Sequence, residues 1–224
     1  MSDLISFSSV SPHITSIAIS FIVWQNLVYI LKRNNLSHLW FGFTHHCVLT
    51  CLSIYYMVKC RDVLSISYMI PFLEKSPVYT APIGHIFTGY ILADVLNRKL
   101  QKSPFTILDW IHHTISIVYT ITCITLNPYN IDTPFLGLQE LSSIFLYIMY
   151  LGVNKPWVRI MFIISFLTIR IGLGGHGAIM RTISYTDNKI PINLIISVFW
   201  WLQFCINSGF TYMILKKAFR PKKN

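Results

Sequence analysis

Two neighbouring histidines beside an aspartate form the stretch of this sequence that is best suited to chemistry. The residues Asp109-Trp110-Ile111-His112-His113 place the carboxylate three positions before His112 and four before His113. On a helix these residues share a face, so Asp109 can fix the tautomer of an imidazole and leave its other ring nitrogen free as a base or ligand. We therefore select His112, His113 and Asp109 as candidate catalytic residues. The alternative is that both histidines only form hydrogen bonds to neighbouring helices.

A glutamate within an apolar stretch is the second candidate. Glu140 lies in Gln139-Glu140-Leu141-Ser142-Ser143, and a buried glutamate needs either a proton or a cation. Arg170 is the only basic residue that the sequence places well inside an apolar segment, so we expect the two side chains to pair. Such a pair can fix the packing of two helices or bind a ligand, and the sequence leaves both roles open.

Further polar residues inside apolar segments are candidates for lipid binding or for structural hydrogen bonds. Gln203 and Asn207 are four positions apart on one face of a predicted helix, where bonds between helices are the simpler role. Each such residue is costly to place in a membrane and is a functional candidate by default. The complete set is Asp94, His85, Glu140, Arg170, Gln203 and Asn207.

The composition of the chain shows what kind of elements must position these residues. Of its 224 residues, 54% are hydrophobic and only 12% are charged, with a mean hydropathy of +0.55. A soluble domain carries about 25% charged residues, and so few charges cannot cover a surface that faces water. The net charge of +10 fits contact with anionic lipid headgroups better than with nucleic acid. We predict an integral membrane protein that does not bind nucleic acid.

Seven apolar segments approach the length that crosses a bilayer, about 20 apolar residues per helix. The second, third and fifth are the weakest. The fold class is therefore all-α, a polytopic bundle of about seven transmembrane helices over residues 14–219, without a second domain. The predicted helices are Ile14–Leu31, His38–Val58, Val78–Leu96, Leu108–Leu126, Pro134–Leu151, Trp157–Ile179 and Ile190–Leu215.

The basic residues of the connecting segments predict the orientation of this bundle. Twelve Lys and Arg residues fall on one side, including those of the tail 216–224, and five, including Arg181, fall on the other. Because basic residues concentrate in cytoplasmic loops, we expect the short N-terminal segment 1–13 outside and the basic tail in the cytoplasm. Seven helices, an odd number, agree with termini on opposite sides.

This orientation divides the polar candidates into two layers, at a rise of about 1.5 Å per residue. A direct proton transfer needs about 3 Å between the groups. His113 and Glu140 would therefore act together only if helices were strongly tilted or broken. The outer layer would hold His85, Glu140 and Arg170, and the inner layer Asp94, Asp109, His112 and His113.

Three blocks, in their order and spacing, resemble the TLC family, the domain shared by TRAM, Lag1 and CLN8 proteins. They are Asp109–Thr114, Gln139–Leu146 and Phe166–Ile171, and the resemblance extends from about Trp40 to Phe219. Ceramide synthases of this family carry the His-His pair and a downstream motif with His-Asp and another Asp. This chain has Gln139-Glu140-Leu141-Ser142-Ser143 at that place, and so it is more similar to the small TLC-domain-containing proteins.

The resemblance implies a multi-spanning protein of the endoplasmic reticulum or another endomembrane, in preference to the plasma membrane. Its implied function is membrane lipid homeostasis, by binding or regulating an acyl-lipid or sphingolipid within the bundle. The alternative is an N-acyltransferase of the ceramide synthase type, which would use acyl-CoA and a sphingoid base. In that case His113 would act as the base, His112 would polarise the thioester and Asp109 would orient the pair.

No metal centre or cofactor is expected in either case, and acyl-CoA would be a substrate. A third hypothesis is a haem or metal protein that uses His45 or His46 together with His85 and His112 or His113, but no HxxxH spacing supports it. The expected partners are membrane lipids, and the sequence is compatible with a homo-oligomer.

Overall fold

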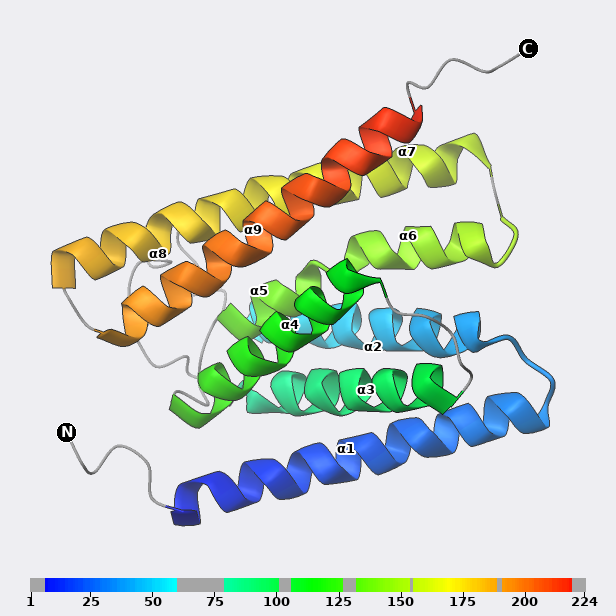
Figure 1. Ribbon diagram of the computed structural model, residues 1–224, viewed down its shortest axis with the longest axis horizontal. Coiled ribbons are helices and arrows are strands. Elements are labelled where there is room, and N and C mark those ends of the chain that lie inside the picture. Colours follow the sequence, from blue (N-terminus) through cyan, green and yellow to red (C-terminus); the bar gives the residue numbers. More distant parts are fainter. Residues whose placement is uncertain are drawn as a thin grey trace.

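The computed structural model describes residues 7–59, 79–100, 106–126, 132–153, 155–188 and 191–218, and this part of the chain is helical without a strand (Figure 1). The predicted ends of the chain, residues 1–6 and 219–224, lie outside the described residues. The helices are α1 (Phe7–Arg33), α2 (His38–Lys59), α3 (Ala81–Leu100), α4 (Ile107–Leu126), α5 (Asp132–Leu138), α6 (Leu141–Tyr150), α7 (Pro156–Ser165), the π-helix η3 (Phe166–Leu173), α8 (Gly174–Asn188) and α9 (Pro191–Ala218).

Each of the seven predicted segments coincides with a helix or with a run of consecutive helices. The fifth is broken into α5 and α6, and the sixth continues from α7 through η3 into α8. By length and composition, three helical stretches of the described residues are apolar enough to cross a membrane. They are Ser11–Arg33, Pro156–Ile183 and Leu194–Ile214. The all-helical fold is therefore confirmed, together with three strongly apolar candidate spans.

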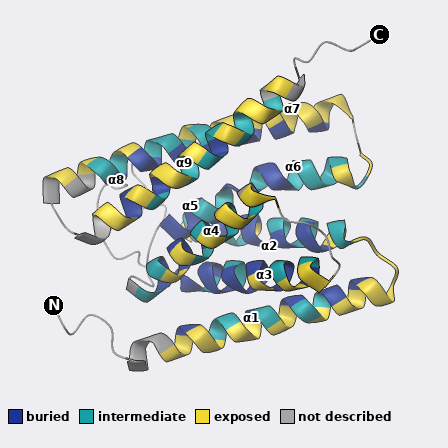
Figure 2. Ribbon diagram, in the orientation of Figure 1, coloured by how far each residue is buried: buried dark blue, intermediate teal, exposed yellow. Residues whose placement is uncertain are grey.

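Many large apolar side chains are exposed on the outer surface, although the bundle also buries apolar clusters. Large apolar side chains face outward, such as Val23 with 60% of its surface exposed, whereas Asn207 and His45 have none exposed. Figure 2 shows that α1 is mostly exposed or partly exposed and that much of α3 is buried. An outer surface of this kind needs an apolar surrounding, so the fold is suited to a lipid environment.

Helix α1 lies along α3 (Figure 1), and polar side chains join the two helices. Trp24 donates its indole N–H to the carbonyl of Ile86 at 3.2 Å, and Asn97 donates to the Gln25 side chain at 3.3 Å. The ring of Trp24 also meets the His45 ring of α2 edge to face. These contacts fix α1 against the rest of the bundle.

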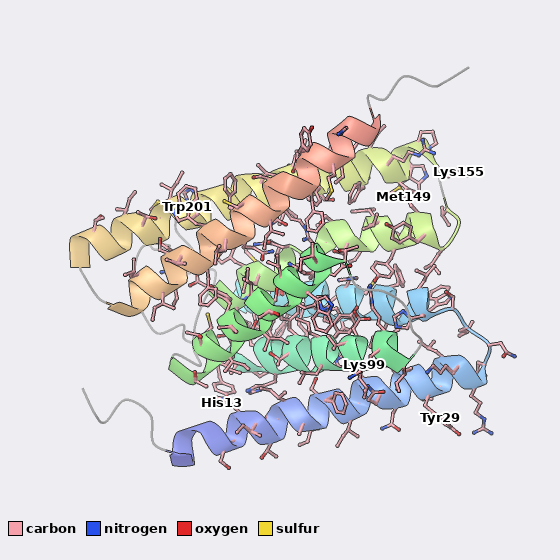
Figure 3. The ribbon with its side chains drawn as sticks, viewed as in Figure 1. His13, Tyr29, Lys99, Met149, Lys155 and Trp201 are labelled. Carbon is pink, nitrogen blue, oxygen red and sulfur yellow. The ribbon has the colours of Figure 1, made fainter. Side chains whose placement is uncertain are left out.

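Basic residues gather at one end of the bundle. Figure 3 shows Lys99 and Lys155 at the same end and His13 at the opposite one. The last turn of α1, with Lys32 and Arg33, also lies at the basic end (Figure 1). This is the distribution on which the predicted orientation depends.

One arginine departs from that prediction. Arg181 was expected among the loop charges of the opposite side, but it is buried in α8 and its Nη2 lies 2.6 Å from Asp132 Oδ1 of α5. A second bond runs from Arg181 Nε to the same oxygen at 3.2 Å. Arg181 is therefore part of a buried ion pair between helices, and counting loop charges from sequence alone placed it wrongly.

Candidate functional site

The break between α5 and α6 places Glu140 inside the bundle. The backbone N–H groups of Gln139 and Glu140 bond to carbonyls only three positions earlier, at Leu136 and Gly137, and the regular α pattern resumes when Ile144 bonds to the Glu140 carbonyl. Glu140 is buried. Because the helix is interrupted at this point, the carboxylate is presented toward α2 and η3 rather than along one helix face.

Glu140 is held by three neighbours, and all three bond to the same oxygen. His46 Nδ1 lies 2.8 Å from Oε2, the Ser143 hydroxyl donates to Oε2 at 2.9 Å, and Arg170 Nη2 lies 3.4 Å from it. The expected pair of Glu140 and Arg170 is therefore present. A buried carboxylate with a cation and two further hydrogen-bonding groups is well compensated for its loss of hydration.

Arg170 reaches this position from the π-helix η3. Its Nε donates to Ser142 Oγ and its Nη2 to Ser143 Oγ, both at 2.7 Å, and its Nη1 donates to Asn207 Oδ1 at 3.4 Å. Asn207 of α9 in turn donates to the Gln139 side chain at 3.3 Å. π-Helical turns often occur at functional sites, and here the turn carries the one cation of the cluster. We name this cluster the polar network, and its members are His46, Gln139, Glu140, Ser142, Ser143, Arg170 and Asn207.

A cavity of about 30 Å³ lies beside the polar network. It is lined by residues of α3, α4, α5 and α9 and of the break at residues 139–140. We call this cavity the central cavity, and Trp200 is one of the aromatic residues that line it. The indole ring of Trp200 packs so closely on Gly177 that a Cβ atom at position 177 would lie 2.6 Å from the ring. The polar residues that line the central cavity are His112, Ser116, Tyr119, Thr120, Gln139, Glu140, Trp200 and Gln203.

Several polar atoms of these lining residues have no hydrogen-bond partner in the described part of the chain. The buried atoms of this kind are His112 Nδ1, Tyr119 Oη, Thr120 Oγ1, Gln139 Nε2 and Trp200 Nε1. Thr120, Gln139 and Trp200 are each only 2% exposed. Unpaired polar atoms are rare in a protein interior and costly there. All of these residues line the same cavity, and Gln139 also belongs to the polar network.

The central cavity corrects the prediction of two separate layers. His112, from the predicted inner layer, and Glu140, from the predicted outer layer, line the same cavity. The depth estimate treated each segment as one straight helix, whereas the fifth segment is broken at Glu140. His112, Ser116 and Thr120 follow one another at intervals of four on α4, so one face of this helix lines the cavity.

Asp109 has a different position from the one expected. Its Oδ2 accepts hydrogen bonds from the backbone N–H and the hydroxyl of Thr106, both at 2.9 Å, and Thr106 Oγ1 accepts one from the Asp109 N–H at 3.2 Å. This reciprocal arrangement is a capping box at the start of α4. The Asp109 carboxylate thus caps the helix instead of orienting the imidazole of His112 or His113.

Two further candidate residues, Asp94 and His85, have partners outside the central cavity. Asp94 pairs with Arg98 at 3.1 Å and lies 3.7 Å from His38 Nε2, at the basic end of α3. His85 shares a 2.9 Å hydrogen bond with His13 of α1. Neither residue belongs to the polar network, and His85 lies with His13, which is at the end opposite Lys99 and Lys155 (Figure 3).

Three more residues of the predicted site lie in different places: they are His113, Gln203 and Asn207. His113 is not among the residues that line the central cavity, because adjacent positions on a helix point about 100° apart. Gln203 lines the cavity, and Asn207 belongs to the polar network. Sequence reasoning did not select His46 for the site, although a histidine inside an apolar segment is itself a signal. The assigned roles of these residues stay predictions.

Among the residues that the structure describes, no group of three or more His, Cys, Asp or Glu side chains is arranged to hold a metal ion. The His45 ring stacks on Tyr90 with centroids 3.4 Å apart, and the His46 ring bonds to Glu140. These two histidines therefore have aromatic and ionic partners within the bundle.

Comparison with known proteins gives one match. The model of the TLC domain family, named for TRAM, LAG1 and CLN8, matches residues 35–216. No curated protein and no solved structure matches the chain. The match covers α2 to α9 and hence the polar network and the central cavity, whereas α1 precedes it. Since the matched residues make up most of the chain, this protein belongs to the TLC domain family, and this indicates a membrane protein with a function related to membrane lipids.

Proposed function

We propose that this chain is a multi-pass membrane protein that binds the polar group of an acyl-lipid or sphingolipid in its central cavity and so takes part in membrane lipid homeostasis. The proposed arrangement has seven transmembrane segments, with the N-terminus outside and the C-terminus in the cytoplasm. The proposed location is the endoplasmic reticulum or another endomembrane. Membership of the TLC domain family supports a lipid-related role.

The observation that carries the proposal is the set of unpaired polar atoms around the central cavity. His112 Nδ1, Gln139 Nε2 and Trp200 Nε1 are buried without a partner among the described residues, in a bundle whose outer surface is apolar. An unsatisfied polar group in such surroundings costs several kcal/mol. A bound polar group that pairs with these atoms recovers part of that cost, and the surrounding membrane supplies lipids as the available ligands.

A cavity-filling substitution tests this proposal. In Ser116→Leu the larger side chain enters the cavity from α4, where Ser116 is buried. We expect native mass spectrometry of gently purified protein to show a co-purifying lipid with the unaltered chain and at least a tenfold lower lipid occupancy with Ser116→Leu. The matched control is Thr114→Leu, which makes a similar change on the exposed face of the same helix and is expected to retain the lipid.

Two results would contradict the proposal. One is equal lipid occupancy in Ser116→Leu, Thr114→Leu and the unaltered protein, which would place the lipid elsewhere. The other is acyl transfer to a long-chain base by purified protein that disappears in His112→Ala and His113→Ala, which would make the protein an enzyme rather than a lipid-binding or regulatory protein.

A further inference from the structure

We propose that the lipid group held in the central cavity is small and uncharged and both donates and accepts hydrogen bonds, as the hydroxyl group of a neutral lipid does. This inference rests on the proposed function and narrows it to one class of ligand. It follows from the hydrogen-bonding capacity, the charge and the size of the cavity.

The first requirement on the ligand is an acceptor atom. Trp200 Nε1 is a donor and has no acceptor capacity, and the Gln139 amide nitrogen is likewise a donor. Both atoms are buried without a partner in the described residues, and both residues line the cavity. The oxygen of the Gln139 side chain is already engaged by Asn207 at 3.3 Å, which leaves only the amide N–H groups of Gln139 to be satisfied. A ligand oxygen can receive these donors.

The second requirement is a donor atom. Glu140 lines the cavity, and its bonds to His46, Ser143 and Arg170 all end on Oε2. Its second oxygen, Oε1, accepts no hydrogen bond from the residues that the structure describes. A carboxylate oxygen only accepts, so a ligand that satisfies Oε1 must carry an O–H or N–H group.

The third requirement is the absence of net charge. The charge of Glu140 is already balanced by Arg170 through the 3.4 Å contact, and Arg170 makes three further hydrogen bonds. An anionic phosphate or carboxylate would face the Glu140 carboxylate at close range. An ammonium group would add a second cation beside Arg170. Both lose hydration on entering the buried cavity without a free counter-charge.

The size of the cavity agrees with a hydroxyl group. About 30 Å³ is enough for a polar group of roughly the size of a water molecule. A bulky phosphodiester headgroup does not fit this space without movement of α4 or α9. The hydrocarbon part of the ligand would remain among the apolar side chains of the bundle.

Four probes that share the same hydrocarbon chain and differ in their polar head group test the inference in the full-length purified protein. They are oleyl alcohol, its methyl ether, oleic acid and oleylamine, titrated by native mass spectrometry. We expect oleyl alcohol to bind at least tenfold more tightly than each of the others. The methyl ether keeps the acceptor and loses the donor, so it isolates the bond to Glu140, and one hydrogen bond to a charged group is worth about tenfold in affinity.

Two pairs of variants connect the binding to the named atoms. Trp200→Phe removes the indole N–H, and we expect about tenfold weaker binding of oleyl alcohol. Trp201→Phe is its control, because Trp201 bonds to Thr182 and lies outside the cavity lining. Should Trp200→Phe fail to fold because of its packing on Gly177, Thr120→Val provides the second variant, with Thr114→Val as control. Both cavity variants should weaken alcohol binding, and both controls should leave it unchanged.

Failure of this inference can be distinguished from failure of the proposed function. If no probe binds and no lipid co-purifies, both the proposed function and this inference are wrong. If oleic acid or oleylamine binds as tightly as oleyl alcohol, and Ser116→Leu still abolishes lipid binding, the cavity is a lipid site but the ligand is charged. Equal binding of the alcohol and its methyl ether would overturn the role of Glu140 as an acceptor.

Discussion

Glu140 and Arg170 depend on each other, and their pairing gives a prediction at the scale of single residues. Arg170→Met leaves the buried carboxylate with only His46 and Ser143 as partners. Removing one member of a buried ion pair costs about 3–5 kcal/mol, so we expect the melting temperature in detergent to fall on the order of 10 °C. Thermal unfolding followed by tryptophan fluorescence measures this change.

The same substitution at an exposed arginine provides the control. Arg33→Met, in the exposed last turn of α1, should change the stability by no more than about 0.5 kcal/mol. Adding Glu140→Gln to Arg170→Met removes the unpaired charge and should restore part of the lost stability. Equal melting temperatures for Arg170→Met and Arg33→Met would show that the pair does not stabilise the bundle.

Single residues also show how far the sequence could predict the site. Glu140 and Arg170 could be paired from sequence because a buried glutamate needs a cation and Arg170 is the only basic residue placed well inside an apolar segment. His46 could not be assigned, because choosing among eight histidines requires the rotation of each helix about its axis. For the same reason His112 and His113 could not be separated, although only His112 lines the cavity.

At the scale of elements, substitutions at the start of α4 distinguish a helix-capping role of Asp109 from a catalytic or orienting role. In a capping box, Thr106 and Asp109 satisfy each other's backbone N–H groups. We therefore expect Asp109→Ala and Thr106→Ala each to destabilise the protein by about 1 kcal/mol. The double variant should cost little more than either single variant, because the two side chains act as one unit. Lipid occupancy should remain unchanged in all three.

A catalytic or orienting role for Asp109 predicts the opposite result. Asp109→Ala would then lower lipid binding or an acyl-transfer activity, whereas Thr106→Ala would leave both intact, since Thr106 precedes the histidines by two turns. Comparing the two variants in the same native mass spectrometry experiment decides between the roles. A selective loss in Asp109→Ala would contradict the capping assignment.

The elements that the sequence predicted well are those with a local cause. Hydropathy located the seven segments, because burial of the backbone in an apolar surrounding requires continuous apolar helices. The break at residues 139–140 and the π-helix η3 were not predicted. Both are stabilised by contacts between distant segments, such as the bond from Arg170 to Ser142, which no local pattern of hydropathy contains.

At the scale of the whole molecule, the predicted orientation of the bundle depends on the charges at its two ends. Lys32, Arg33, Lys99 and Lys155 lie at one end. Arg181, which the sequence assigned to the other side, is buried in its pair with Asp132. Leaving Arg181 out changes the sequence count of basic residues on the two sides from twelve against five to twelve against four, which favours the predicted cytoplasmic position of the basic end more strongly.

A glycosylation reporter at each end of the chain tests this orientation. An acceptor tag fused to the N-terminus should be glycosylated on expression in microsomes, and the same tag fused to the C-terminus should remain unmodified, because only the lumenal side holds the glycosylation enzymes. Glycosylation at both ends would require an even number of spans. Glycosylation at the C-terminus alone would place the basic end in the lumen and overturn the orientation.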